Sequence, residues 1–291
     1  MSGHDGRART RRRHDRPLLG PPASPAGHHD DRRRPARPGA QARRPGHALG
    51  RRRGRLRDLP GRAHKPADLA TLSVDEEVAS VVADIESGAG DGPVVLVAHS
   101  SGGLVVPGVV SALGGRVSSI LLNAALVPAE GGWGIDCMKE RHREGLVLAL
   151  AAAERDGRTI TLPGPPGDPE SFRHAYGGDP LDDETLAFVV DPVRCVEDTV
   201  HHYFQPVHWS AVSGVPITYV LNERDRPVPP DTQEEMARRL PAPATVLRVD
   251  SGHLLPVTSP ATFAGVVAGV VAGSGAVAPG AASSPSGSTS L

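Results

Sequence analysis

Residues 93–103 read PVVLVAHSSGG, and the expected fold of the chain follows from this stretch. Its residues 94–97 form a short apolar run rich in β-branched side chains, which is typical of a strand buried on both faces. A polar turn follows at once, and an apolar series that begins at Leu104 is typical of a buried helix. A strand, a turn that carries a serine and a helix are the context of a nucleophile elbow, in which a strained turn lifts the serine hydroxyl above the end of a sheet.

The elbow requires small residues two positions before and two positions after the serine, because the strand and the helix approach closely there. Ala98 and Gly102 occupy these positions around Ser100, so the pattern is A-x-S-x-G instead of G-x-S-x-G. The alternative is an ordinary strand-to-helix turn in which Ser100 or Ser101 only caps the helix. This stretch alone leaves both interpretations open.

The 291 residues suffice for one large α/β domain or two small ones. The two cysteines, Cys137 and Cys195, form neither a disulfide framework nor a metal motif, and they agree with a reducing, cytoplasmic location. The apolar stretch 263–271 is too short to span a bilayer. We therefore expect no membrane association.

Residues 1–62 differ in composition from the rest of the chain. They hold 18 Arg against 5 Asp, with no Lys or Glu, which gives a net charge of +13 and leaves −14 for the remainder of a chain of net charge −1. They lack Val, Ile, Phe, Tyr and Trp, so they cannot bury enough surface to offset their ordering entropy. The composition predicts a disordered arm over residues 1–62.

Three interpretations of this arm compete. A basic arm could bind nucleic acid through arginine blocks such as residues 11–13, 32–34 and 51–53, or it could be a merely solvated segment. The mixture of Arg, Pro, Gly and His is also typical of a GC-rich reading frame translated out of register, which is the interpretation we favour over nucleic-acid binding.

The remaining chain alternates helical and strand patterns. Ser73-x-x-Glu76 is a capping box that predicts a helix over 73–87. The other expected elements are, in order, a strand at 117–127, helices near 145–154, 183–190 and 193–204, a strand at 216–221, a helix from the Asp231-x-x-Glu234 cap to residue 240, a strand at 246–249 and a helix at 260–272. We expect 63–128 and 214–273 to form the core, 129–213 a helical cap and 274–291 a flexible tail.

Ser100, Asp225 and His253 each follow the carboxyl end of a predicted strand, where open α/β sheets place their ligands. A serine hydroxyl is a weak nucleophile and needs a base, and an imidazole base needs an acid to fix its tautomer. Glu223 and Asp250 are rival acids in the same loops, and His253 could instead be a histidine satisfied within the core.

Three motifs together resemble the α/β-hydrolase family: VAHSSGG at 97–103, YVLNERDRPVP at 219–229 and DSGHLLP at 250–256. With FQPVHW at 204–209, the chain is most similar to small esterases related to plant methylesterases and hydroxynitrile lyases. The resemblance covers about residues 57–272. It implies an α/β-hydrolase sheet flanked by helices, and acyl transfer from a small-molecule ester to water without a metal or an organic cofactor.

Within the resemblance, Ser100 is the expected nucleophile, His253 the general base and then acid, and Asp225 the carboxylate that orients the imidazole. The backbone N–H of Ser101 is the expected oxyanion donor. Substrate-pocket candidates are His99, Trp133, Phe204 and Trp209.

Three cap histidines, His201, His202 and His208, are spaced in a way that could suggest a metal site. No cysteine or carboxylate is placed in the sequence to complete one, so we expect no metal.

The chain departs from the family pattern upstream, where such hydrolases carry a His-Gly motif whose loop donates the second oxyanion N–H. Nothing in residues 1–62 resembles that motif or its strand. We therefore expect the N-terminal strands to be missing or replaced by the arm, and the second donor is unidentified. Losing one donor costs about 10²–10³ in rate.

The leading hypothesis is a serine hydrolase that cleaves a small, fairly apolar ester. The first alternative is a catalytically inactive relative, either a truncated or mis-framed product or a ligand-binding module. A second alternative is a hydroxynitrile-lyase reaction on the same serine and histidine, because a fold and a triad do not fix the reaction.

Overall fold

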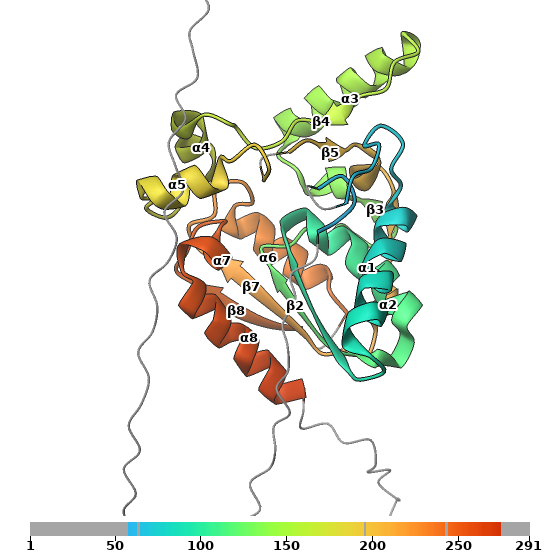
Figure 1. Cartoon of the computed structure of the whole chain (residues 1–291), viewed down its shortest axis with the longest axis vertical. Coiled ribbons are helices and arrows are strands. Elements are labelled where there is room, and N and C mark those ends of the chain that lie inside the picture. The colour runs from blue at the N-terminus through green and yellow to red at the C-terminus, as the bar shows by residue number, and fades with distance from the viewer. Residues whose placement is uncertain (1–57, 63–64, 195, 242–243, 275–291) are drawn as a thin grey trace, which may run out of the picture. The chain divides into compact units, whose positions relative to one another are not determined.

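A parallel sheet, to which the described residues contribute four strands, lies at the centre of the computed structural model (Figure 1). The strands are β1 (Val94–His99), β2 (Val117–Asn123), β7 (Ile217–Asn222) and β8 (Ala244–Val249), and they lie side by side in that order. Because all neighbouring pairs are parallel, the carboxyl ends of the four strands point to the same end of the sheet.

The structure describes residues 58–274 except 63–64, 195 and 242–243. The chain divides into two units, Met1–Arg53 and Gly54–Leu291, and every described residue belongs to the second. Two predictions concern residues outside the described ranges. One is the arm over residues 1–57, with its replacement of the early strands, and the other is the flexible tail beyond residue 274. Residues 58–62, which we assigned to the arm, belong to the folded part, because Arg62 pairs with Asp198 at 3.2 Å.

The two inner strands supply the most deeply buried side chains. On β2, Ile120 and Leu122 face one cluster and Leu121 the other, as the two-residue period of a strand requires. β2 ends earlier than the predicted residue 127, because Ala124 adopts a positive φ of 43° and turns the chain out of the sheet.

The outer strands correct one prediction. We expected residues 94–97 to be buried on both faces, yet Val97 is 45% exposed, and no residue of β1 is fully buried. Among the described residues β1 has a neighbouring strand, β2, on one side only. β8 is the strand at the other edge of the sheet, and its middle residues, such as Val246 and Leu247, are likewise exposed.

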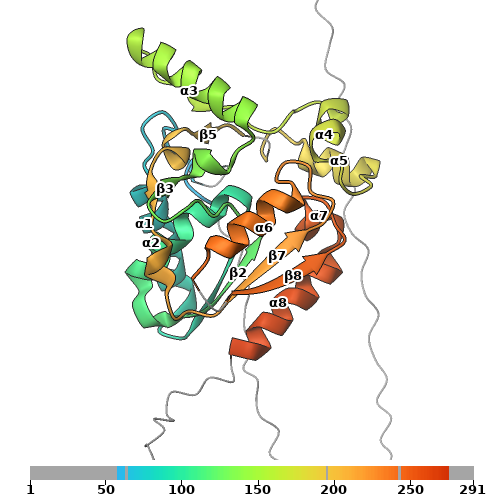
Figure 2. The same ribbon diagram turned by 180° about the vertical axis from the view of Figure 1, so that it is seen from behind.

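Helices cover both faces of the sheet (Figures 1 and 2). On one face lie α1 (Val74–Ala89), α2 (Val106–Leu113) and α6 (Pro230–Arg239), which pack on the larger cluster. On the other lie α7 (Leu255–Thr258) and α8 (Pro260–Ser274), whose Phe263 and Val267 pack on Leu121 and Val220. The expected arrangement, a parallel sheet flanked by helices, is confirmed.

The helix ends follow local signals with one exception. At α1 the expected capping box is present, because the Glu76 N–H donates to Ser73 and the Ser73 N–H donates to the Glu76 carboxylate. The predicted cap at Asp231 is wrong: α6 begins at Pro230, because proline suits the first position of a helix, and Asp231 lies inside the first turn.

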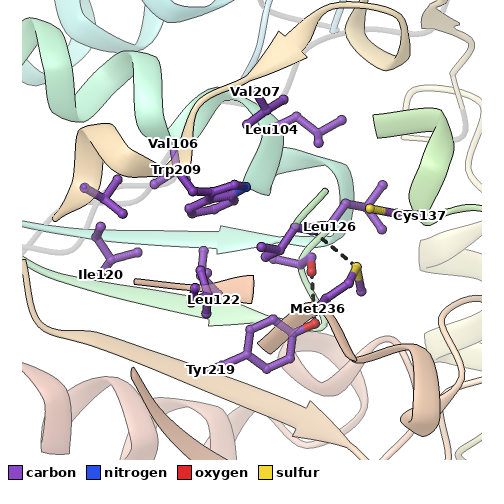
Figure 3. Packing of buried hydrophobic residues seen from close by; sticks show 14 of the residues in the cluster. Leu104, Val106, Ile120, Leu122, Leu126, Cys137, Val207, Trp209, Tyr219 and Met236 are labelled. Atoms are coloured by element: carbon purple, nitrogen blue, oxygen red, sulfur yellow. Dashed lines mark hydrogen bonds between the residues drawn. The ribbon is translucent and has the colours of Figure 1, made fainter. Parts of the chain in front are cut away.

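The larger cluster is a close-packed apolar core (Figure 3). Trp209 lies among Val106, Ile120 and Leu122, and the Tyr219 hydroxyl donates to the Ala125 carbonyl at 2.9 Å. Trp209 is 2% exposed. The large side chains between β2 and α2 thus fix the position of the helix that follows the predicted elbow.

The segment 129–213 connects β2 to β7. Its helices are α3 (Glu140–Arg155), which extends away from the sheet in both views, α4 (Pro169–Tyr176) and α5 (Asp183–Val189). The helix predicted at 193–204 is wrong, because that stretch holds a short strand and one 3₁₀ turn. The small elements of the segment are β3 (Gly132–Trp133), η3 (Gly134–Cys137), β4 (Thr161–Leu162), β5 (Asp198–Thr199), η4 (His201–Tyr203), β6 (Pro206–Val207) and η5 (Trp209–Val212).

Two further 3₁₀ turns flank α2. They are η1 (Ser100–Val105), which joins β1 to α2, and η2 (Gly114–Arg116), which leads into β2. Pro107 lies in the first turn of α2, a position that proline tolerates because no backbone N–H is needed there.

Candidate active site

Ser100 lies directly after β1 in a strained backbone conformation. Its φ is +53°, which few non-glycine residues adopt, and it opens η1. Its carbonyl accepts a hydrogen bond from the Leu126 N–H at 2.9 Å. The strand, the strained serine and the helical turn are those expected of a nucleophile elbow.

The glycine that allows this turn is not the one the motif indicates. A Cβ at Gly102 would lie 4.0 Å from the Ala98 side chain, an ordinary contact, so close approach does not require glycine there. A Cβ at Gly103 would lie 2.6 Å from the Leu126 carbonyl oxygen, which is closer than real Cβ contacts. Gly103 therefore lets the turn pack on the segment after β2.

His253 and Asp225 come from loops that follow neighbouring strands. The histidine loop, residues 250–254, follows β8, and the acid loop, residues 223–229, follows β7. The His253 Nδ1 lies 2.7 Å from the Asp225 Oδ2, and the Val228 N–H donates to the other carboxylate oxygen at 2.8 Å. Both side chains are buried. Because Nδ1–H donates to the carboxylate, Nε2 of a neutral imidazole is left as the basic atom.

The rival acids have other partners. Asp250 pairs with Arg224 at 2.7 Å, and Glu223 lies 3.5 Å from Arg248. Their side chains are 74% and 42% exposed. Of the three acids the sequence offered, the one that the structure places against His253 is Asp225.

His99 connects the serine strand to the histidine loop. Its Nε2 lies 2.9 Å from the His253 carbonyl oxygen, and the two rings are 4.6 Å apart. Burial, and then the charge of His253, lower the pKa of His99 to about 3, so its neutral ring donates Nε2–H to that carbonyl. Among the described residues no hydrogen bond joins the Ser100 hydroxyl to His253. Such bonds often tighten only when substrate is bound.

An aspartate that the sequence analysis missed holds the two loops together. Asp179, which lies between α4 and α5, accepts hydrogen bonds from Arg224 at 2.7 Å, from Ser251 at 2.8 Å and from Thr258 at 2.6 Å. Burial raises the pKa of Asp179, but these hydrogen bonds outweigh it and lower the pKa below the ordinary value. No sequence signal marks Asp179, because its partners lie 45–79 residues away.

A model of the alpha/beta hydrolase family matches residues 42–266, which include all of the predicted triad. The chain belongs to the alpha/beta hydrolase family. No curated protein sequence matches it.

Solved structures similar to this hydrolase include an alpha/beta-hydrolase and two esterases. An extracellular alpha/beta-hydrolase from a Paenibacillus species has 16% identity and a TM-score of 0.59, over 74% of this chain and 85% of that one. A thermophilic esterase from Thermogutta terrifontis has 16% identity and a TM-score of 0.55, over 75% of this chain and 78% of that one. A methylesterase from Arabidopsis has 20% identity and a TM-score of 0.54, over 74% of this chain and 85% of that one. At such identities the likeness shows the shared fold.

The predicted pocket residues separate into two groups. Trp133 is 45% exposed, and its ring lies 6.1 Å from that of Phe204, at the β3–β6 ladder of the hydrolase. Trp209, by contrast, is 2% exposed and packs in the apolar core with residues of α2 and β2. Tyr176, which we did not predict, lies 5.8 Å from the His253 ring.

A hollow of about 180 Å³ between η3 and α6 is lined by Cys137 and Arg239 but by none of the predicted triad. Burial raises the pKa of the Cys137 thiol to about 12, so this thiol stays protonated and is a poor nucleophile.

The cap histidines point to separate partners. His201 contacts the Ala70 carbonyl, and His208 lies 3.4 Å from Glu130. His202 contacts Glu77 and Ser101. In the described ranges no group of three potential metal ligands is found, and no helix there is both apolar and long enough for a membrane span.

Proposed function

We propose that this alpha/beta hydrolase cleaves a small ester through Ser100, His253 and Asp225. The observation that carries the proposal is the buried 2.7 Å contact between His253 Nδ1 and Asp225, in loops next to a serine with φ of +53°. The similarity to two solved esterases supports the choice of ester substrates.

In the proposed reaction, the Ser100 Oγ attacks the ester carbonyl while its proton passes to His253 Nε2. The new Oγ–C bond forms a tetrahedral oxyanion, and the carbonyl re-forms as the C–O bond to the alcohol breaks. The alcohol leaves with the proton that His253 holds. Water then attacks the acyl group, gives a proton to His253 and releases the carboxylic acid as the proton returns to Ser100.

The backbone N–H of Ser101 is the proposed donor to the oxyanion. It lies in the first turn of η1, where backbone N–H groups have no partner within the helix. Because the Ser100 carbonyl accepts from Leu126, the trans peptide directs the Ser101 N–H to the opposite side, away from Leu126.

Hydrolysis of p-nitrophenyl acetate and butyrate tests the proposal. We expect turnover by the wild-type chain and a loss of at least about 10⁴-fold in Ser100→Ala. A matched control is Ser118→Ala, since Ser118 lies at the opposite end of the sheet from Ser100. Turnover that persists in Ser100→Ala would contradict the assignment, and folded wild-type protein without turnover would favour the inactive or lyase alternatives.

A further inference from the structure

A buried histidine and a buried glutamate lie directly behind the predicted elbow. Glu77 comes from α1 and His202 from η4, and each side chain is 1% exposed. The His202 Nδ1 lies 2.6 Å from a Glu77 carboxylate oxygen, and its Nε2 lies 2.8 Å from the Ser101 carbonyl oxygen. The proposed mechanism uses neither side chain.

The His202 Nε2 faces a backbone carbonyl oxygen, which only accepts hydrogen bonds, and its Nδ1 faces a Glu77 oxygen, which only accepts them when the carboxyl is ionised. With Glu77 ionised, both ring nitrogens therefore face acceptors. A neutral imidazole has one N–H and could donate to one of them, and its other nitrogen would set a lone pair against an oxygen. The ring satisfies both contacts when it carries two protons, and the carboxylate of Glu77 balances that charge.

The charged groups around His202 agree with this state. Burial opposes the charged ring, but the hydrogen bond and charge of Glu77, the charge of Asp198 and the Ser101 carbonyl together raise the pKa of His202. Asp198 itself is paired with Arg62. The neighbouring Tyr203 packs edge-on against the ring and stays protonated, because burial raises its pKa.

We propose that Glu77 and His202 form a buried ionised clamp that positions Ser101 and thereby directs its N–H toward the oxyanion. This inference rests on the proposed function. The clamp holds the Ser101 carbonyl, and Leu126 holds the Ser100 carbonyl, so both peptide groups that flank the Ser101 Cα are anchored. His202 contacts the Ser101 carbonyl and Glu77 contacts His202. Among the described residues no hydrogen bond joins either side chain to the triad, so both are positioning residues.

The protonation of His202 in the clamp also makes the reactivity of Ser100 depend on pH. Because the pKa of His202 is raised, the doubly protonated ring persists to higher pH than in an ordinary histidine and is lost as pH rises through that pKa. A ring with one proton donates to the charged Glu77 and leaves Ser101 without its donor. We expect the reactivity of Ser100 to fall at alkaline pH for this reason.

Two substitutions at His202 separate its contact with the Ser101 carbonyl from its contact with Glu77. His202→Gln places an amide N–H near the position of Nε2 and can still donate to the Ser101 carbonyl, whereas the shorter His202→Asn reaches only toward Glu77. Both remove the ionised ring. We expect labelling of Ser100 by a fluorophosphonate to be about 10- to 100-fold slower in the Asn variant than in the Gln variant.

The readout is the rate constant at which the fluorophosphonate labels Ser100, expressed for the active fraction of the protein. Titration of reactive serine gives that fraction, and kcat and KM for p-nitrophenyl butyrate are measured on the same samples. A purely structural role would lower the amount of active protein and leave the rate constant of the remainder unchanged. His201→Gln and His201→Asn are matched controls on the same turn and should not differ. Equal rate constants in the two His202 variants would overturn the proposal.

Nuclear magnetic resonance of the wild-type ring tests the clamp without any activity. In ¹⁵N-labelled full-length protein at pH 7 we expect both ring nitrogens of His202 to carry protons. Glu77→Gln should shift the loss of the second proton to lower pH. Glu86→Gln, on the same helix, is the control and should have no effect. A singly protonated ring at pH 7 would overturn the proposal even if neither His202 variant folds. If the wild type fails to label while this ring is doubly protonated, the proposed function fails, together with the catalytic role of the clamp, although the ionised pair itself is present.

Discussion

The serine side and the histidine side of the candidate site are held by different groups. On the serine side, Leu126 and His202 contact the backbone carbonyls on either side of the Ser101 N–H. On the histidine side, two carboxylates hold the groups in place. Asp225 contacts the His253 ring, and Asp179 binds both the loop that carries this ring and the loop that carries Asp225. The serine side is thus fixed through its backbone and the histidine side through charged side chains.

Both sides nevertheless depend on the segment that connects β2 to β7. His202 and Asp179 come from this segment, and neither lies in a motif of the family. The segment is therefore part of the support for the site and not only a cover over it.

The largest expected effect comes from the histidine side. Asp225→Asn removes the carboxylate that fixes the His253 tautomer, so we expect kcat for an activated ester to fall by about 10⁴-fold. Steady-state kinetics measures this. Glu223→Gln, in the same loop but paired with Arg248, is the control and should leave kcat unchanged. Similar losses in both variants would show that the acid has been misassigned.

A smaller effect is expected from loosening the two loops. Asp179→Asn weakens charge-assisted hydrogen bonds to Arg224, Ser251 and Thr258, and we expect a loss of about 2–3 kcal/mol in the free energy of unfolding. Because the folded pKa of Asp179 is lowered, the stability it gives is full above about pH 5 and is lost as pH falls through that pKa. Urea unfolding at several pH values measures the difference.

The control for Asp179 is Asp250→Asn, since Asp250 also contacts Arg224 but is 74% exposed. Exposed ion pairs contribute about 0–1 kcal/mol. A difference between wild type and Asp179→Asn that does not shrink in acid would contradict the role of the charge.

On the serine side, the glycine that matters should be Gly103. The added Cβ of Gly103→Ala would meet the Leu126 carbonyl, so we expect about 1–3 kcal/mol of destabilisation and slower labelling of Ser100. Gly102→Ala is the matched control and should be close to wild type, since its Cβ would make an ordinary contact. Thermal unfolding and labelling rates distinguish them, and the reverse order would contradict the geometry.

The smallest effect is expected at the contact between the two sides. His99→Gln loses the ring that donates to the His253 carbonyl, a contact of about 1 kcal/mol, so we expect kcat/KM to fall by about fivefold. Because the pKa of His99 is about 3, the ring is neutral throughout the assay range. The shape of the pH–rate profile between about pH 5 and 9 should therefore stay that of the wild type, and a displaced limb would show that His99 titrates there.

The sequence predicts the elements whose pattern is local. Continuous apolar runs mark β1, β2 and β7, and the polar residues that follow them include Ser100 and Asp225 because side chains at strand ends leave the core. The capping box at Ser73 predicts the start of α1 to within one residue, since the two side chains involved are three positions apart.

Features that depend on contacts between distant residues could not be predicted. Glu77 reads as one of several acids in the first turn of a helix, and its partner His202 lies 125 positions away, so no periodicity connects them. The burial of Trp209 depends on packing against α2, which lies about 100 positions earlier in the chain. The exposure of Val97 likewise depends on which strands pair with β1.

The most direct test of the account is the intact mass of the full-length protein after incubation with a fluorophosphonate probe. We expect one probe adduct per chain, located on Ser100 by peptide mapping and absent from Ser100→Ala and His253→Ala. A folded wild-type protein that gains no mass, or an adduct that persists in Ser100→Ala, would contradict the claim that this fold activates Ser100.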